Sequence, residues 1–199
     1  MPNYTRKAIM NIFMEQLERK SLDKITVKDI IEEAGVNRNT FYYHFKDIYD
    51  LIDKIFEEEL EKRLSEIDEE LTFYEEYKKA ATIFSNNRKA IIHMEHSKSN
   101  EVVYHYIKEI TDICVEKFVR RYARECDISE EGIDFITHFY GSAMCSNTIQ
   151  WVREGMPGYR DEFLKIVSTS FEATIQNMID NYVEFENKNL DKKRVVPKN

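Results

Sequence analysis

Hydrophobic and polar residues alternate along most of this chain at steps of three and four, the spacing that gathers apolar side chains on one face of an α-helix. Only 5 glycines and 3 prolines occur in 199 residues, too few for many strand turns. We therefore predict an all-α fold of about nine helices. The pattern places them at residues 4–20, 27–34, 38–45, 47–63, 73–84, 90–94, 102–124, 129–154 and 159–184.

The stretch TVKDIIEEAG, residues 26–35, predicts a short helix with marked ends. Thr26 can accept the first free backbone N–H groups as an N-cap, and Asp29 stands where a capping box needs its second member. The helix should therefore begin at Val27. Gly35 should end it, because glycine adopts the left-handed conformation at no side-chain cost.

The segment after this turn, residues 37–45, predicts a second helix with one buried side. Asn37 is a good N-cap, and Phe41 and Phe45 lie four residues apart on the same face. Two short helices joined by a glycine turn, the second crowded with outward polar and aromatic groups, are typical of a DNA-binding helix-turn-helix. A helical hairpin in some other α domain is the alternative, but it needs no exposed tyrosine and histidine. The outward side chains are Arg38, Asn39, Thr40, Tyr42, Tyr43 and His44.

The run AGVNRNTFYYHFKD, preceded by TVKDI, resembles the helix-turn-helix of TetR/AcrR-type transcriptional regulators over about residues 5–60. Turn glycine, threonine, tyrosine, histidine and phenylalanine all fall in register. Two positions depart from the family pattern, because Ile31 replaces the usual alanine and Asn39 replaces a frequent glycine. Asparagine pairs bidentately with adenine in the major groove, so Asn39 adds a candidate specificity contact.

Eight residues are predicted to contact double-stranded DNA, the partner that the resemblance implies. We expect phosphate contacts from Thr40, Tyr42, His44 and Lys46, base contacts from Arg38, Asn39 and Tyr43, and further phosphate attraction from Lys28. Arg6 and Lys7 could also reach phosphates, or they could form a solvated first turn.

The net charge of −8 is unevenly distributed for a DNA-binding protein. Residues 1–50 hold eight basic and eight acidic side chains, which sum to zero, so the whole excess of −8 lies in the remainder. Attraction to phosphates must then depend on the local placement of Lys28, Arg38 and Lys46, helped by backbone N–H groups at helix N-termini. We expect modest non-specific affinity for DNA.

Other chemistry is weakly indicated. Three cysteines without a C-x-x-C spacing suggest neither a disulfide framework nor a zinc site and fit a reducing cytosol. His93 and His96 have the H-x-x-H spacing, but a metal site would need further nearby ligands, so we expect no metal. The sequence has no nucleophile elbow, phosphate loop, signal peptide or membrane span, so we expect a cytoplasmic protein that is not an enzyme and carries no cofactor.

The chain is predicted to divide into three parts: a DNA-binding domain at residues 1–46, an effector-binding and dimerisation domain at 47–186, and a disordered tail at 187–199. The helix that opens at Asp47 joins the first two parts. In TetR-type proteins the middle helices enclose an effector pocket, and here that region is aromatic and apolar, although ordinary bundle core would look the same. Its candidate effector residues are Tyr104, Ile107, Cys114, Phe118, His138 and Phe139.

The last two predicted helices are apolar on more than one side, so each needs more partners than one chain readily offers. Two helices from each of two subunits would form an isologous four-helix interface, as the resemblance implies. The closing WVREGM is most similar to the firmicute-type C-terminal subgroup, which includes activators of dihydroxyacetone-kinase operons. The candidate interface residues are Gly141, Met144, Thr148, Trp151, Phe171, Ile175 and Met178.

Together with these patterns, the resemblance implies a homodimeric transcription factor, most often a repressor in this family, that binds a palindromic operator and responds to a small-molecule effector. A second interpretation is a TetR-like coactivator, whose C-terminal bundle binds a partner protein instead of a small molecule.

Overall fold

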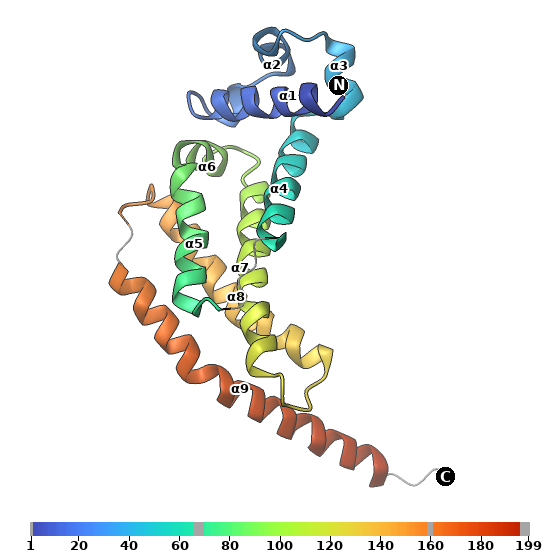
Figure 1. The fold of residues 1–199 in the computed structure, drawn as a ribbon, viewed down its shortest axis with the longest axis vertical. Helices are drawn as coiled ribbons and strands as arrows, with labels where there is room; N and C mark the ends of the chain where they lie inside the picture. The colour runs from blue at the N-terminus through green and yellow to red at the C-terminus, as the bar shows by residue number, and fades with distance from the viewer. Residues whose placement is uncertain (1, 66–69, 159–160, 196–199) are drawn as a thin grey trace. The chain divides into compact units, whose positions relative to one another are not determined.

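The structure, a computed structural model, describes residues 2–65, 70–158 and 161–195, and Figure 1 shows the helices that they form. Within these ranges the chain forms nine α-helices, one short 3-10 helix and no strand, which confirms the predicted all-α class. The helices are α1 (Pro2–Leu17), η1 (Leu22–Lys24), α2 (Val27–Ala34), α3 (Arg38–His44), α4 (Ile48–Ser65), α5 (Phe73–Asn86), α6 (Arg88–Glu95), α7 (Glu101–Tyr122), α8 (Glu130–Arg153) and α9 (Asp161–Val195).

The helix α2 begins and ends, and α3 begins, where their capping chemistry predicted, while α3 ends at His44, one residue before its predicted end. The hydroxyl of Thr26 accepts from the Asp29 backbone N–H at 3.2 Å, and the Asp29 carboxylate accepts from the Thr26 N–H at 3.0 Å, so the capping box is complete. Gly35 closes α2 in the left-handed conformation, with φ of 65°. The Asn37 amide oxygen then accepts from the Thr40 N–H at 2.9 Å and opens α3.

Two later helices also begin with a capping side chain. The Asp47 carboxylate accepts from the backbone N–H groups of Tyr49 and Asp50 at 2.8 and 2.9 Å at the start of α4. At the start of α8 the Ser129 hydroxyl accepts from the Gly132 N–H at 3.1 Å. Side-chain oxygens thus satisfy backbone donors that a helix N-terminus would otherwise leave unpaired.

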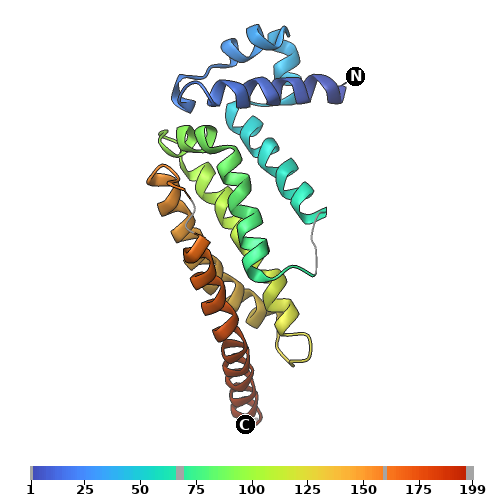
Figure 2. The ribbon, with the colours of Figure 1, turned by 60° about the vertical axis from the view of Figure 1, so that its left-hand side comes forward.

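The chain divides into two compact units, and each has its own core. The first unit takes in residues 1–69, 82–107 and 149–157. In it, α1 packs against α2 and α6, and α2 packs against α3, as Figure 2 shows for α1 to α3. This unit includes α4, whereas the functional division predicted from the sequence separates α4 from the helices before it. Its largest fully buried side chains include Ile9, Phe13, Leu17, Ile30, Phe41, Phe45, Leu51 and Ile52.

The second unit takes in residues 70–81, 108–148 and 158–199, and its described part has a core rich in phenylalanine. Phe73, Phe118 and Phe171 meet there, with ring centroids 4.1 Å apart for Phe73 and Phe171 and 5.0 Å for Phe73 and Phe118. A buried ion pair between Lys117 and Glu76, at 3.0 Å, ties α7 to α5 beside these rings.

The helix α9 extends further than the sequence predicted. We expected it to end near Glu184 and the tail from residue 187 to be disordered, but α9 continues to Val195, so that prediction was wrong for residues 187–195. Once a helix is nucleated, each added residue costs little, and the segment NKNLDKKR contains several good helix formers. The predicted tail beyond residue 195 lies outside the described residues.

Two further predictions concern membranes and metals. Among the described helices, none combines the length and the apolar character that crossing a bilayer requires. His93 of the predicted H-x-x-H pair instead contacts the backbone carbonyl of Leu17 through its Nδ1 atom and so joins α6 to the end of α1. No cluster of three or more potential metal ligands occurs in the part of the chain that the structure describes.

Candidate functional site

The helix α3 is held by two buried phenylalanines and presents its other side to solvent. Phe41 and Phe45 are 0% and 1% exposed, with ring centroids 5.7 Å apart. On the opposite side Tyr43 is 77% exposed and Tyr42 is 47% exposed. Two adjacent exposed aromatic rings beside Arg38, Asn39 and His44 on one short helix make this surface of α3 a candidate interface.

Arg38 and Tyr42, one turn apart on α3, contact each other. The Arg38 guanidinium donates to the Tyr42 hydroxyl at 3.4 Å and lies 5.6 Å from the centre of its ring. A cation over an exposed aromatic ring gains only about 0.5–1 kcal/mol, so this pairing orients both side chains without fixing them.

The remaining predicted contact residues of α3 differ in exposure. Asn39 is exposed, whereas Thr40 and His44 are half-buried. The Thr40 hydroxyl donates to the Asn37 amide oxygen at 3.1 Å, and the His44 ring meets Tyr43 edge-on with centroids 4.9 Å apart. The structure therefore gathers all the predicted residues of α3 on one short helix, with Asn39 and Tyr43 the most open.

The predicted cations that lie outside α3 differ in their contacts. Lys46 follows α3 directly and is exposed, and the Lys28 ammonium on α2 lies 3.8 Å from the Glu32 carboxylate. Arg6 forms an ion pair with Glu58 of α4 and is therefore not simply solvated, while its phosphate contact stays a prediction. Lys7, its neighbour, lines a cavity.

A polar cluster fixes α1 against α2 and so positions the helix-turn-helix. Gln16 is only 3% exposed. Its side-chain amide donates to the Asp29 carbonyl at 3.1 Å and to the Glu33 carboxylate at 2.7 Å. Arg19 adds a bond to Glu33 at 3.0 Å, and Lys20 pairs with the Asp29 carboxylate at 3.1 Å.

These bonds favour the charged carboxylates. Hydrogen bonds from Gln16, and then from Arg19, hold the pKa of Glu33 below its ordinary value. The hydrogen bond from Lys20, with those from Thr26, does the same for the pKa of Asp29.

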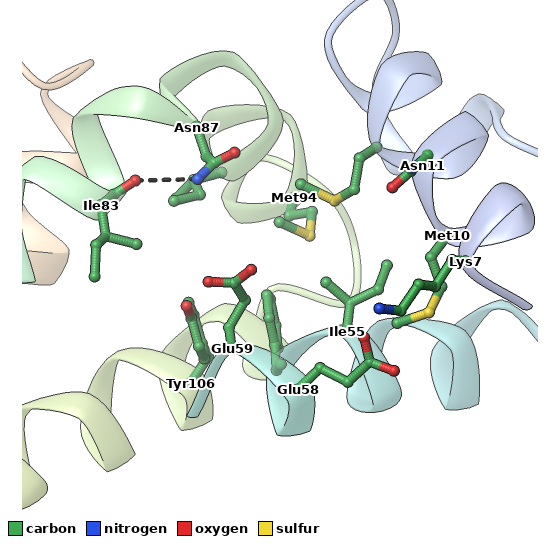
Figure 3. A pocket seen from close by; sticks show the side chains of 13 residues that line it. Lys7, Met10, Asn11, Ile55, Glu58, Glu59, Ile83, Asn87, Met94 and Tyr106 are labelled. Atoms are coloured by element: carbon green, nitrogen blue, oxygen red, sulfur yellow. Dashed lines mark hydrogen bonds between the residues drawn. The ribbon is translucent and has the colours of Figure 1, made fainter. Parts of the chain in front are cut away.

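A cavity of about 410 Å³ lies within the first unit (Figure 3). Helices α1, α4, α5, α6 and α7 all contribute to its wall, so helices on both sides of the sequence-predicted domain boundary meet there. Its size falls in the range of pockets that hold small molecules. The wall is formed by Lys7, Met10, Asn11, Met14, Ile55, Phe56, Glu58, Glu59, Ile83, Asn87, Ile91, Met94 and Tyr106.

The six residues predicted for effector binding do not line this cavity. Ile107, Cys114 and Phe118 are buried in the protein core, and Tyr104, His138 and Phe139 are exposed. The prediction pointed to an aromatic region of α7 and α8, but the sequence did not indicate which side of each helix faces a cavity. Tyr106, two residues from Tyr104, turns its ring to the cavity instead.

Sequence reasoning missed most of the residues that do line the cavity. A signal was present, because Met10 and Met14 lie four residues apart on α1 and flexible methionines often line adaptable binding surfaces. Without knowledge of how α1 packs against α6, that pair looked like ordinary core.

The residues predicted for a dimer interface lie mainly inside the chain. Met144, Phe171 and Ile175 belong to the core of the second unit, and Thr148 is 3% exposed. Gly141 is also buried, and a β-carbon there would lie 2.0 Å from an Asp112 carboxylate oxygen on α7. The structure contradicts these five as surface contacts, because their stripe packs α8 and α9 against the rest of their own unit. Trp151 and Met178 are half-buried.

A different set of apolar side chains is exposed on the same two helices. Phe135 and Phe139 of α8 are 51% and 53% exposed, and Ile166 of α9 is 64% exposed. Phe163 and Phe185 of α9 are also among the exposed large hydrophobic residues. Apolar groups of this size outside a core commonly mark a surface that another protein covers.

Comparison with known proteins decides the family. The model for "Bacterial regulatory proteins, tetR family" matches residues 13–55, which contain the helix-turn-helix, and a model for the "Transcriptional regulator C-terminal region" of TetR proteins matches residues 72–173. The chain belongs to the TetR family. It is therefore a DNA-binding transcriptional regulator, and proteins of this family commonly form dimers.

Solved structures of other TetR-family proteins share this fold. The "Dihydroxyacetone kinase operon activator DhaS" aligns with a TM-score of 0.65 and 18% identity, over 89% of this chain and 97% of that one. A TetR transcriptional regulator from Streptococcus agalactiae 2603V aligns with a TM-score of 0.59 and 24% identity, over 85% of this chain and 94% of that one. No curated protein matches this TetR-family chain by sequence.

Proposed function

We propose that this TetR-family protein is a ligand-responsive repressor that binds a palindromic operator as a homodimer. The cavity carries the proposal, because α1 and α4 of the unit that holds the helix-turn-helix form part of its wall. A small molecule there would contact the helices that support α3 directly.

The proposed DNA contacts follow from the exposed side of α3. Asn39, Arg38 and Tyr43 would meet base edges, while Tyr42, Thr40, His44, Lys46 and Lys28 would hold phosphates. Two recognition helices of a dimer would enter successive major grooves, about 34–36 Å apart.

The proposed regulation is a shift in population. A ligand that binds better when the two recognition helices are out of register with successive grooves would draw the protein away from DNA. Coupling of this kind is typically about 1–3 kcal/mol, which changes DNA affinity roughly 5- to 150-fold.

The proposed homodimer would form through the exposed apolar residues of α8 and α9, and not through the buried set predicted from the sequence. Phe135, Phe139 and Ile166 offer apolar surface that a second copy could cover in an isologous interface. We place the regulator in the cytoplasm, where a DNA-binding protein finds its target.

A second candidate function is a coactivator whose α8 and α9 bind a partner protein. The observation that favours it is the fold shared with DhaS, a protein named as an operon activator. The exposed apolar residues of α8 and α9 would then meet a different chain.

Selection of bound duplexes from a random DNA pool, followed by operator titrations, tests the first proposal. We expect a palindrome with half-sites one helical turn apart, and a small molecule that both raises the melting temperature and releases the operator. A stoichiometric protein partner, with no compound that alters operator affinity, would favour the coactivator instead.

A further inference from the structure

The cavity in the first unit has an uneven distribution of charge. Of its two carboxylates, Glu58 is neutralised by Arg6, whereas Glu59 forms no ion pair with any described residue. Figure 3 shows Glu59 beside Tyr106 at one end, and Lys7 next to Glu58 at the other. The Tyr106 end of the cavity therefore holds a carboxylate without an ion pair to a described residue, and Glu59 acts on Tyr106 more strongly than the buried Arg63 does.

The same end of the cavity is aromatic. The rings of Phe56 and Tyr106 stack in parallel, with centroids 3.9 Å apart and planes 6° from each other. Aromatic faces are regions of negative potential, and they attract a cation more strongly once water is removed from it. The stacked pair and the Glu59 carboxylate thus favour the same sign of ligand charge.

The rest of the wall suits an apolar body. Met10, Met14 and Met94 contribute flexible, polarisable thioethers, and Ile83 and Ile91 add aliphatic surface. A fully hydrated small ion would gain little from this wall, whereas an organic ion with aromatic or alkyl groups would bury apolar area against it.

The Tyr106 hydroxyl is a neutral group at this end of the cavity. Burial raises the pKa of Tyr106, and the neighbouring Glu59 raises it further, against an opposing effect of Arg63. Tyr106 therefore stays neutral across the physiological range, and Glu59 remains the negative group at this end.

Among the described residues of the wall, Lys7 is the one whose charge opposes a cationic ligand, while Arg63 acts on Tyr106 from outside the wall. Its side chain is exposed and lies at the end away from Tyr106, and it forms no ion pair with a described residue. A long lysine side chain can extend its ammonium group into water while its methylene groups cover apolar surface. Lys7 can therefore move away from a cation held at Glu59.

We propose that this cavity binds an apolar organic cation, such as a quaternary ammonium, a phosphonium or a protonated amine with aromatic groups, through Glu59 and the stacked Phe56 and Tyr106. The inference rests on the proposed ligand-responsive function and names the chemical class of its effector. The positive centre sits between the carboxylate and the rings, and the apolar groups face the methionines.

Tetraphenylphosphonium and tetraphenylborate, ions of similar shape and opposite charge, are suitable probes for isothermal titration calorimetry on the full chain. We expect the phosphonium to bind and the borate to bind at least tenfold more weakly. Glu59→Gln should weaken phosphonium binding roughly fivefold, the effect of losing about 1 kcal/mol of charge interaction at a partly exposed site. Glu61→Gln removes the same charge from an exposed position of α4 outside the cavity and should leave the affinity unchanged.

Lys7→Gln gives an independent check, because removing the opposing charge should leave phosphonium binding equal or tighter. Equal binding of the two probes, or the same loss in Glu59→Gln and Glu61→Gln, would overturn the inference. Operator titrations separate it from the proposed function. If the phosphonium binds through Glu59 but leaves operator affinity unchanged, the cation site stands and ligand-responsive repression fails; if it does not bind while another compound releases the operator, the repressor stands and the cation site fails.

Discussion

At the scale of single residues, α3 separates side chains that are free to read DNA from side chains already engaged. Asn39 and Tyr43 are exposed, whereas Arg38 is paired with Tyr42 and the Thr40 hydroxyl with Asn37. Because a bidentate amide contact to adenine depends on one base, while a phosphate contact does not, changes at these positions should have different signatures.

Asn39→Ala should relax the preference at one base pair by about 1–3 kcal/mol. Tyr42→Phe removes the hydroxyl that would reach a phosphate and should weaken binding about equally for all sequences. Titration of the selected operator and of single-base variants, at one salt concentration, distinguishes the two. Unchanged operator affinity in both variants would remove these residues from the interface.

Glu33 links stability to pH through its bonds to Gln16 and Arg19. Its folded pKa is lowered from an ordinary value of 4.5, first by the Gln16 hydrogen bond and then by Arg19, so its contribution is present above that value and is lost as the pH falls through the folded pKa. Glu33→Gln should lower the melting temperature at pH 7, and this difference from wild type should shrink toward pH 3.

The matched control is Glu32→Gln, which removes the same charge from the adjacent residue, whose nearest cation is Lys28 at 3.8 Å. It should change the melting temperature at pH 7 less than Glu33→Gln does. A gap between wild type and Glu33→Gln that stays constant with pH would contradict the assignment.

The helix starts at capping residues were the most predictable feature of the residue scale, because capping is local chemistry. Thr26, Asn37, Asp47 and Ser129 each supply a side-chain oxygen within three residues of the donor that it satisfies, so sequence spacing alone was sufficient. The role of Arg6 could not be predicted in this way, because its partner Glu58 lies 52 positions away in the sequence.

At the scale of elements, the sequence pattern predicted that α8 and α9 are helices but did not predict their buried sides. Both helices are apolar on more than one side, so periodicity identified them as helices but did not say which side faced the core. The stripe with Met144 and Ile175 packs inside the chain, and the side with Phe139 is exposed. The cavity was unpredictable for a similar reason, because its wall comes from five helices.

Gly141 of α8 lies directly against Asp112 of α7, and Gly141→Ala should destabilise the protein by about 1–3 kcal/mol. A β-carbon would lie 2.0 Å from an Asp112 oxygen, and that oxygen is buried without a hydrogen-bond partner in the described structure. The alanine must therefore displace Asp112 from its pair with Lys108.

Combining Gly141→Ala with Asp112→Ala tests this explanation by urea unfolding. Without the carboxylate, the alanine should gain up to about 1 kcal/mol from its higher helix propensity. An equal destabilisation by Gly141→Ala in both backgrounds would show that Asp112 is not the obstacle.

At the scale of the whole molecule, the net charge of −8 and the balanced first 50 residues limit what electrostatics can contribute to DNA binding. Each phosphate that a lysine or arginine neutralises adds to the salt dependence of binding, and few such cations are available per chain. Operator affinity should then depend strongly on engaging two half-sites at once, which makes assembly of two copies important.

Phe139→Ser should therefore weaken both dimerisation and operator binding. The ring is 53% exposed in the single chain, and covering it should contribute about 1–2 kcal/mol per copy, or roughly 2–4 kcal/mol in a two-fold interface. The dimer dissociation constant measured by sedimentation should rise roughly 30- to 1000-fold. Tyr104→Ser, which removes an aromatic ring that is 48% exposed on α7, should leave the dimer intact; matching behaviour of the two variants would place the interface elsewhere.

The contact between Arg38 and Tyr42 also bears on how fast the regulator can search a chromosome. Its modest strength, about 0.5–1 kcal/mol, favours the paired rotamer only a few-fold, and exposed side chains change rotamer within picoseconds to nanoseconds. While the protein slides along phosphates, Arg38 can thus leave the ring and test base edges many times at each position. Mismatched sites would be rejected without any rearrangement of α3, so the time spent on wrong sequences is set by the phosphate contacts alone.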